Sequence, residues 1–295
     1  MPIRPIRVTL AAMFWRTGLP AIVAVLVAFA LVAGSRGLGE PPPQAVVAQP
    51  APPPSSTPPS LDPGVVTAAV NEVAPGTDLA FALYDEQTGQ SLASVNGDQQ
   101  FYTASLVKLF IALDALQRNE WHPSERLGAN LTEMLSASDD GIAEALWEYG
   151  GRSAIITRMV QLIGLAHTRP PTFSDQWEMT KTTADDLVAV YRFLVERVPD
   201  EARGLVLGAM AGAQNPAADG FPQYFGIPDG LPDLPRAVKQ GWMTIQRAVV
   251  LNTTGLVDSR YVVVLLAELP LETSYARGRA ALTAGIAALA PVLGH

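Results

Sequence analysis

Cysteine is absent from this chain of 295 residues, and histidine is scarce. Without cysteine the chain has no disulfides, no thiolate metal sites, no cysteine nucleophile and no acylated lipobox. Only three histidines occur, which leaves little basis for a multi-histidine metal site. We therefore expect a function that uses no metal ion and no other cofactor.

Positively charged residues are also fewer than negatively charged ones. The chain has 20 Lys and Arg residues and 28 Asp and Glu residues, which gives a net charge of −8. This sign is opposite to the one that attracts nucleic acid, so we expect no nucleic-acid partner. Hydrophobic residues make up 48% of the chain, enough to bury a sizeable core. That fraction excludes disorder along the whole length.

The N-terminal segment contains a long run without any charge. Residues 1–16 are basic, and residues 17–35 follow with no charged side chain. Nineteen such residues can cross the ~30 Å hydrocarbon layer of a bilayer. The preceding arginines favour a cytoplasmic N-terminus. We predict a membrane anchor or signal segment, with the rest of the chain outside the cytoplasm; cleavage near the small residues 33–35 would release it as a secreted protein.

Proline dominates the next segment, residues 36–64, which includes the run EPPPQAVVAQPAPPPSSTPPSLDP. Such a run cannot form helices or sheet ladders and favours an extended, polyproline-like conformation. We interpret it as a spacer; a recognition motif for a proline-binding domain is the alternative. Residues 65–295 are then expected to form one folded domain.

Hydrophobic periodicity in this domain predicts a mixed α+β fold. Strands are expected near both ends and helices between them. The expected strands are 79–85, 90–96, 236–242, 248–257 and 261–269; the expected helices include 66–74, 103–117, 183–198 and 276–293. We predict an antiparallel sheet built from both ends of the domain, with an inserted helical region.

Lysine is rare as well, and one of the three lysines lies in an apolar context. Lys108 is surrounded by Leu106, Val107, Leu109 and Phe110 in an expected helix. A buried ammonium is costly, so such a lysine should be paired or partly deprotonated. Ser105 lies one helical turn earlier, and a desolvated lysine can take the proton of a serine hydroxyl. The alternative is a serine near a helix N-cap followed by a lysine that reaches solvent.

Two further short motifs contain polar residues at element boundaries. Ser138 and Asp140 precede a helix, where serine and aspartate are also ordinary N-caps. Lys239, Gln240 and Gly241 lie on a late strand, where the alternative is an exposed lysine on an edge strand. A glycine there permits close approach of a ligand to the backbone.

Together the ordered motifs Ser-x-x-Lys, Ser-Asp-Asp and Lys-Gln-Gly resemble those of the penicillin-recognising serine enzymes, in particular the class A β-lactamase-like fold. The resemblance implies that Ser105 is the acylated nucleophile and that Lys108 activates it. It implies that Ser138 passes a proton to the leaving nitrogen, and that Lys239 supplies positive potential for a substrate carboxylate. These four are the candidate catalytic residues.

The same resemblance suggests Asp140, Gln240, Gly241 and Trp242 as substrate-binding positions. The main-chain N–H groups of Ser105 and Trp242 would form the oxyanion hole. Asp140 stands where the family has asparagine, and an ionised Asp140 could hold Lys108 protonated. Gln240 replaces a small hydroxyl residue that helps to bind carboxylate in the family.

The loop between Leu165 and Thr183 is short and contains one glutamate, Glu178. In the β-lactamases a longer segment holds the glutamate that activates the deacylating water, and Glu178 lies too close to the next helix to match it well. We therefore expect acylation without fast deacylation.

The leading hypothesis is an exported, membrane-tethered serine hydrolase that transfers an acyl group from a small peptide or amide, with peptidoglycan as one candidate source. A cell-envelope binding protein that has lost turnover is the main alternative, and an esterase with unrelated substrates is a weaker one. A Ser-His-Asp hydrolase is disfavoured because the chain has no Gly-x-Ser-x-Gly elbow.

Overall fold

The computed structural model describes residues 61–293. The predicted basic segment 1–16 and anchor 17–35 lie outside the described residues, as does nearly all of the predicted linker 36–64. Within residues 61–293, every helix is too short or too polar to cross a bilayer. Of the predicted folded domain, 65–295, the structure describes all but the last two residues.

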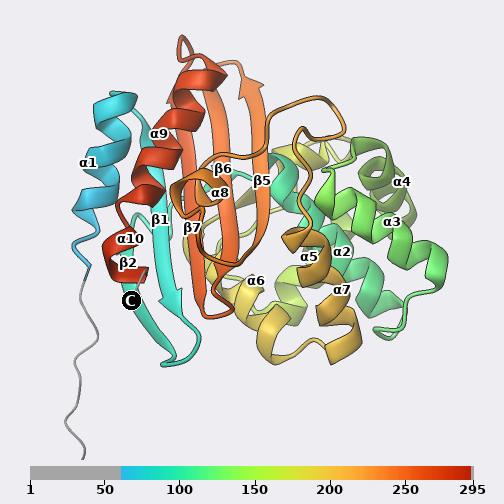
Figure 1. Cartoon of the computed structure of the whole chain (residues 1–295). Helices are drawn as coiled ribbons and strands as arrows, with labels where there is room; N and C mark the ends of the chain where they lie inside the picture. Colours follow the sequence, from blue (N-terminus) through green and yellow to red (C-terminus); the bar gives the residue numbers. More distant parts are fainter. Residues whose placement is uncertain (1–60, 294–295) are drawn as a thin grey trace, which may run out of the picture. The chain divides into compact units, whose positions relative to one another are not determined.

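A five-stranded antiparallel sheet forms the centre of this part (Figure 1). Its order is β2-β1-β7-β6-β5, so the C-terminal strand β7 pairs directly with the N-terminal strand β1. The bounds are β1 Asp78–Asp85, β2 Gln90–Val95, β5 Arg236–Ile245, β6 Ala248–Val257 and β7 Tyr261–Pro270. The predicted sheet built from both chain ends is confirmed, and β5 forms one of its edges.

Helices cover both faces of the sheet (Figure 1). On one face α1 packs along α9, with the short helices α8 and α10 nearby; their bounds are α1 Gly64–Val73, α8 Ile227–Gly230, α9 Tyr275–Ala287 and α10 Ala290–Leu293. The opposite face carries the inserted helical region. Its helices are α2 Val107–Arg118, α3 Glu125–Ser136, α4 Asp140–Gly150, α5 Ser153–Ile163, α6 Ala184–Glu196 and α7 Asp200–Ala211.

Because both faces are covered, the strands bury side chains on both sides. In β1, Ala80 and Ala82 face the core under the inserted helices, while Phe81 and Leu83 face the core under α1 and α9. The two-residue periodicity of a strand therefore separates two apolar cores. This explains why the strands read as nearly continuous hydrophobic runs in the sequence.

The structure differs from the expected elements in three places. Helix α7 was not expected from the sequence, since Gly204 and Gly208 lower helix propensity there. The expected helix 103–117 begins with a 3₁₀ turn, η1 (Ala104–Leu106), before α2. The expected helix 276–293 is divided into α9 and α10.

Three short elements complete the fold: β3 (Phe101–Tyr102), β4 (Lys181–Thr182) and the 3₁₀ turn η2 (Trp177–Met179). Strands β3 and β4 pair with each other and hold the loop before α6 next to the start of η1. Elements of two or three residues leave no periodic signal in a sequence, so they could not be expected.

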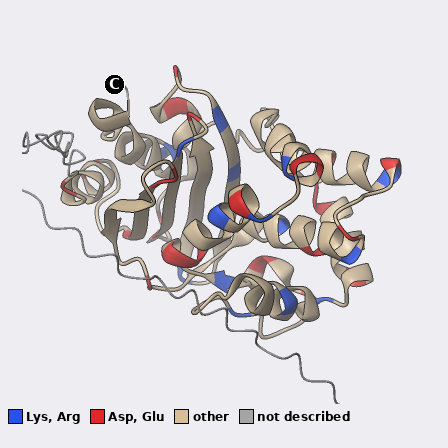
Figure 2. Ribbon diagram, turned by 90° about the horizontal axis from the view of Figure 1, so that it is seen from below, with Lys and Arg blue, Asp and Glu red and all other residues tan. Residues whose placement is uncertain are grey.

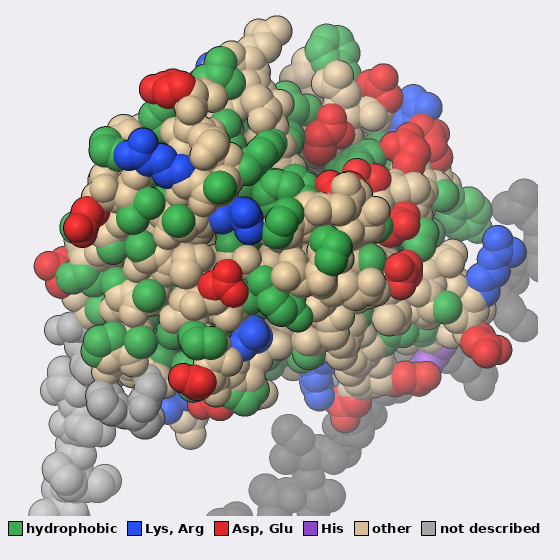
Figure 3. Space-filling model, turned by 45° about the horizontal axis from the view of Figure 1, so that its top comes forward, with side chains coloured by type: hydrophobic (Ala, Val, Ile, Leu, Met, Phe, Trp, Pro, Cys, Tyr) green, Lys and Arg blue, Asp and Glu red, His purple; other side chains and the backbone are tan. Residues whose placement is uncertain are grey.

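Charged residues are interspersed over helices and strands (Figure 2). The space-filling view shows apolar and charged side chains mixed on the surface, with many acidic side chains over the inserted helices (Figure 3). Three aspartates are buried, and two of them meet an arginine: Asp85 with Arg260 and Asp114 with Arg158. The third, Asp186, accepts hydrogen bonds from the backbone N–H groups of Ala166 and His167 and from the Thr168 hydroxyl.

Candidate active site

The four candidate catalytic residues come from four different elements beside the edge strand β5. Ser105 lies in η1, Lys108 in the first turn of α2, Ser138 in the turn between α3 and α4, and Lys239 on β5. All four are buried, and both lysines are at most 1% exposed. The burial inferred for Lys108 from its apolar neighbours is therefore present in the structure.

Hydrogen bonds join these residues into one chain. Lys108 Nζ lies 2.6 Å from Ser105 Oγ and 3.3 Å from Ser138 Oγ. Lys239 Nζ lies 2.9 Å from the same Ser138 Oγ. The four polar atoms thus form a continuous path from the candidate nucleophile to β5. Such convergence of a serine with a potential base is the geometry that nucleophilic catalysis requires.

The backbone is strained at two points of this path. Ala104, directly before Ser105, has φ 45°, and Ser138 itself has φ 57°. Non-glycine residues rarely adopt this left-handed region, and such strain concentrates at functional sites. Both serines are therefore presented by backbone that the surrounding packing holds in an unfavourable conformation.

Asp140 is brought to the same point by the start of α4. The N-cap of this helix is Asp139, whose Oδ1 accepts a hydrogen bond from the Ile142 N–H at 2.7 Å. Asp140 is consequently free to pair with Lys108, and its Oδ1 lies 2.6 Å from Lys108 Nζ. The Asp140 side chain is 62% exposed, so the pair joins a buried ammonium to a carboxylate at the surface.

Burial dominates the electrostatics of both lysines. Desolvation lowers the pKa of Lys108 below its ordinary value, and the Asp140 carboxylate opposes this change. Desolvation also lowers the pKa of Lys239, well below the ordinary range, and the neighbouring Lys108 ammonium acts in the same direction. The ammonium form is therefore more stable at Lys108, where the Asp140 carboxylate favours it, than at Lys239, where the neighbouring ammonium disfavours it.

Gly241 is required by packing within the chain. A Cβ at this position would lie 2.7 Å from the Thr103 carbonyl oxygen and 3.4 Å from Ala104 Cβ. The backbone that approaches β5 closely here is therefore that of η1, which brings Ser105 beside the strand. The sequence predicted close approach at Gly241 but assigned it to a ligand.

The side chains of Gln240 and Trp242 lie outside the hydrogen-bonded path. Gln240 is buried, and its amide donates to the carbonyl oxygens of Gln223 at 3.2 Å and Phe225 at 2.6 Å. Its amide group therefore ties β5 to the preceding loop. Trp242 stacks on Phe221 with ring centroids 4.6 Å apart, and its indole N–H donates to Asp219.

Trp177 was missed in the sequence. Its ring lies 4.7 Å from Lys108 Nζ, and its indole N–H donates to Glu144 Oε2 at 2.9 Å. The ring supplies a cation–π contact on the side of Lys108 that faces the loop. Its position directly before Glu178 was visible, but nothing in the spacing indicated that η2 would turn it toward α2.

Glu178 is near the site but not joined to it. Among residues 61–293 the structure gives its side chain no hydrogen bond to Ser105, and it lines a hollow of about 490 Å³ with Tyr102, Met179 and Thr244. Burial raises the pKa of Glu178, and the nearby carboxylates Asp140 and Glu144 raise it further.

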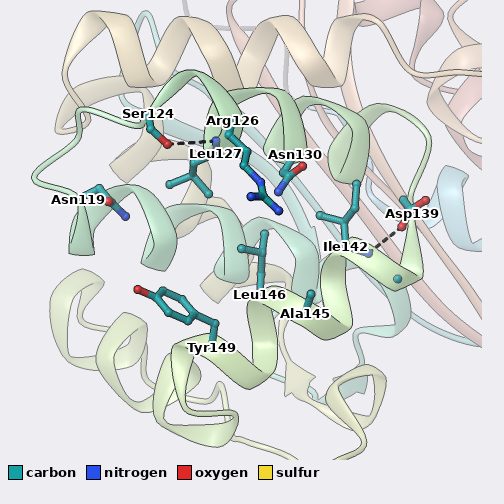
Figure 4. A pocket seen from close by; sticks show the side chains of 11 residues that line it. Asn119, Ser124, Arg126, Leu127, Asn130, Asp139, Ile142, Ala145, Leu146 and Tyr149 are labelled. Carbon is teal, nitrogen blue, oxygen red and sulfur yellow. Dashed lines mark hydrogen bonds between the residues drawn. The ribbon is translucent and has the colours of Figure 1, made fainter.

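A larger pocket of about 730 Å³ lies between α3 and α4 (Figure 4). Leu127, Ile142 and Leu146 provide apolar side chains, and Arg126 and Asn130 point into the same space. None of the candidate catalytic residues lines it. Within residues 61–293, no group of three or more His, Asp or Glu side chains is placed to hold a metal ion.

Comparison with known sequences identifies relatives of this chain. The profile of the family described as "Beta-lactamase enzyme family" matches residues 66–121. The chain is 36% identical over 211 residues to the protein named "Putative lipoprotein LppW" of Mycobacterium tuberculosis and Mycobacterium bovis. The match covers 68% of this chain and 67% of that protein.

Solved structures share the fold. A β-lactamase from Burkholderia vietnamiensis matches with a TM-score of 0.62 and 18% identity, over 78% of this chain and 96% of the other. A β-lactamase from Chitinophaga pinensis matches with a TM-score of 0.59 and 16% identity, over 75% and 98%. The structure described as PBP-A gives a TM-score of 0.61 and 18% identity, over 78% and 96%.

Proposed function

This chain belongs to the β-lactamase-like serine hydrolase superfamily, and we propose that it transfers the acyl group of an amide or small peptide through a covalent ester on Ser105. The observation that carries this proposal is the 2.6 Å contact between Ser105 Oγ and Lys108 Nζ, two buried groups one turn apart. A serine hydroxyl is a weak nucleophile until a neighbouring base removes its proton.

The acylation step follows from the order of the contacts. Ser105 Oγ attacks the acyl carbon and gives its proton to the Lys108 amine as the C–O bond forms. Ser138 Oγ then delivers a proton to the leaving nitrogen as the C–N bond breaks, which leaves the acyl group on Ser105 and frees the amine. Main-chain N–H groups of Ser105 and Trp242 would stabilise the oxyanion.

Deacylation is expected to be slow. The loop between α5 and α6 has one glutamate, and Glu178 lines a neighbouring hollow without a hydrogen bond to Ser105 within the described residues. A water molecule attacking the ester would then lack a dedicated carboxylate base. We therefore propose that the protein acts as a slow hydrolase or as a transferase, and that it hydrolyses β-lactams inefficiently.

For the substrate we propose a peptide or amide outside the cytoplasm, with peptidoglycan fragments as the first class to test. Membrane attachment is proposed through the uncharged segment 17–35. The mycobacterial relative is named a lipoprotein, which supports a membrane location. A chain without cysteine cannot carry a lipid on a lipobox cysteine, so here the apolar segment would replace that attachment.

The alternative of a binding protein without turnover is favoured by one contact. Asp140 Oδ1 lies 2.6 Å from Lys108 Nζ, and this ion pair stabilises the ammonium form, which cannot accept a proton. An envelope protein that keeps the fold and binds peptides non-covalently would tolerate this arrangement.

Covalent labelling separates the two functions. The full chain in detergent would be incubated with a fluorescent penicillin and with a fluorophosphonate, and the adducts located by intact and peptide mass spectrometry. We expect one adduct, on Ser105, that is lost in Ser105→Ala and kept in Ser136→Ala, a control at another buried serine. Absence of any adduct in a folded protein favours the binding role. Turnover of a chromogenic cephalosporin at the rate of a dedicated β-lactamase would contradict slow deacylation.

A further inference from the structure

Two buried amines at the candidate site share a single carboxylate. Lys108 pairs with Asp140, whereas Lys239 contacts Ser138 Oγ at 2.9 Å and the Gln240 carbonyl oxygen at 3.1 Å. Within residues 61–293 no Asp or Glu oxygen lies within ion-pair distance of Lys239. An uncompensated ammonium in such a position is costly because it loses its hydration shell without gaining a counter-charge.

The hydrogen-bond partners of Lys108 match an ammonium group. Lys108 Nζ has three oxygen partners: Ser105 Oγ, Asp140 Oδ1 and Ser138 Oγ. An ammonium has three donors and no acceptor, so all three of its hydrogens are used. The Trp177 ring lies against the same group and adds a further contact that favours a cation.

The partners of Lys239 match a neutral amine instead. A neutral amine has two donors and one acceptor, and Lys239 can donate to the Gln240 carbonyl while accepting from the Ser138 hydroxyl. Ser138 Oγ in turn accepts from Lys108. Every hydrogen bond of the path then has one donor and one acceptor.

The charged groups around Lys239 act in both directions, and the nearest of them opposes a second ammonium. Lys108 is the neighbouring cation, and Ser138 alone separates the two amines. Asp140 and Asp219 are the carboxylates that act on Lys239 from a distance; one is already paired with Lys108 and the other accepts from the Trp242 indole. The Trp242 ring centroid lies 5.8 Å from Lys239 Nζ, farther than the 4.7 Å between Trp177 and Lys108 Nζ, so it favours a cation less than Trp177 does. Burial lowers the pKa of Lys239 well below its ordinary range, in agreement with this arrangement.

We propose that Lys239 is the neutral amine of the resting site and the final acceptor in the proton relay from Ser105, while Lys108 is, at rest, an ammonium held by Asp140. This assignment of charge stands on the contacts and the burial of the two lysines, and its role in acylation rests on the proposed function. It differs from the fixed positive charge that the family resemblance implied for Lys239.

The proton transfer balances without any further reactant. The Ser138 hydroxyl proton moves to Lys239, and Lys108 passes one of its protons to Ser138. The resulting neutral Lys108 takes the proton of Ser105 as Ser105 Oγ attacks the acyl carbon. The acylated site then contains two ammonium groups, Lys108 and Lys239, with Ser138 again a hydroxyl. The leaving nitrogen can recover its proton from Lys239 through Ser138.

The assignment also changes what the resting site recognises. A neutral Lys239 offers a substrate carboxylate no ion pair, and the Gln240 amide is committed to loop carbonyls. Binding of the substrate before acylation should therefore depend little on a free carboxylate. Neutral peptide amides and esters become the preferred class of acyl donor.

The test uses the full chain in detergent with lysine labelled with ¹⁵N at Nζ. Only three lysines exist, so Lys239→Arg and Lys181→Arg assign every signal, and Lys181 outside the path serves as the internal reference. We expect Lys239 to be neutral near pH 7 while Lys108 is an ammonium group. A Lys239 ammonium that persists above pH 9, or a Lys108 that loses its proton first, would overturn the assignment. The Ser105→Ala variant should titrate in the same way.

A second measurement compares two substitutions at Lys239. If a fixed positive charge is needed, Lys239→Arg should retain labelling of Ser105; if a proton acceptor is needed, both Lys239→Arg and Lys239→Met should lose about 100-fold or more in labelling rate. The wild-type labelling rate should fall at acidic pH as Lys239 becomes protonated. Retained labelling in a folded Lys239→Arg protein rejects the relay. A wild-type chain that titrates as expected but never labels rejects the proposed function and leaves the charge assignment intact.

Discussion

Two sets of buried ionisable side chains in this molecule are built differently. Outside the candidate site, two of the three buried aspartates meet an arginine through two parallel contacts: Asp85 with Arg260 at 2.9 and 2.7 Å, and Asp114 with Arg158 at 2.7 and 2.9 Å. At the site, two buried lysines face one carboxylate that is itself mostly exposed.

The difference separates charges that hold the fold from charges that can move protons. Arginine keeps its proton at any physiological pH, and its planar group matches a carboxylate in a fixed geometry. A desolvated lysine with an incomplete set of partners can lose its proton, which is useful only where chemistry is performed. Substitutions in the two groups should therefore have opposite effects on stability.

The largest effect is expected for Asp114→Ala, which leaves Arg158 without its buried partner. Removal of one member of a buried pair should lower the free energy of unfolding by about 3 kcal/mol. Thermal and urea unfolding of the full chain would measure this. The control is Asp200→Ala, where the aspartate of an exposed pair with Arg203 is removed and the change should stay within about 0.5 kcal/mol. Equal effects at both positions would contradict the comparison.

A smaller, pH-dependent effect is expected for Asp85→Asn. The hydrogen bonds from Arg260 lower the pKa of Asp85 from 3.8 to about 2 in the folded protein. A lowered folded pKa contributes stability that is fully present above pH 3.8 and is lost as the pH falls through 2. The variant should lose about 2 kcal/mol at pH 7, and the difference should vanish near pH 2. A difference independent of pH would show that Asp85 acts through packing alone.

The sign should reverse for Lys239→Met at the candidate site. Replacement of a buried amine without a counter-charge by an apolar side chain of similar length should raise the free energy of unfolding by about 1 kcal/mol. Labelling of Ser105 should be lost in the same variant. Lys181→Met is the matched control, with little effect expected on either quantity. If Lys239→Met destabilised the chain as much as Asp114→Ala, Lys239 would belong to the structural group.

The smallest effect on stability is expected for a substitution of Glu86, the residue after Asp85 of the Asp85–Arg260 pair. Burial and the nearby Glu196 raise the pKa of Glu86 from 4.5 to about 7. A raised folded pKa of an acid means that its carboxylate costs stability above that pH and costs nothing below 4.5. Glu86→Gln should therefore be more stable than the wild type at pH 8 by about 0.5 kcal/mol and equal to it at pH 4.5. Glu272→Gln, at an exposed glutamate, is the matched control substitution.

The candidate site could be predicted in part because two of its residues are close in sequence. Ser105 and Lys108 are three positions apart, and a helical turn places such residues on one face. The pairing of Ser138 with Lys239 bridges 101 positions, and only the match to a family suggested it before the structure was known. The direction of the Gln240 side chain and the contact of Trp177 with Lys108 could not be read from either source.

The sequence by itself determined most of the helices and strands, the sheet formed by both ends of the described part, and the Ser105–Lys108 pair, because periodicity and spacing within one element fix which side chains share a face. The tertiary structure decided the rest: which carboxylate reaches Lys108, which lysine is left without one, and how closely η1 approaches β5 at Gly241. Those outcomes depend on atoms from distant elements meeting within a few ångströms, and the free energy of a buried charge is set by all of its neighbours together. The chemistry proposed for this protein therefore rests on the unequal hydrogen-bond and ion-pair partners of two lysines, which the sequence singled out without revealing those partners.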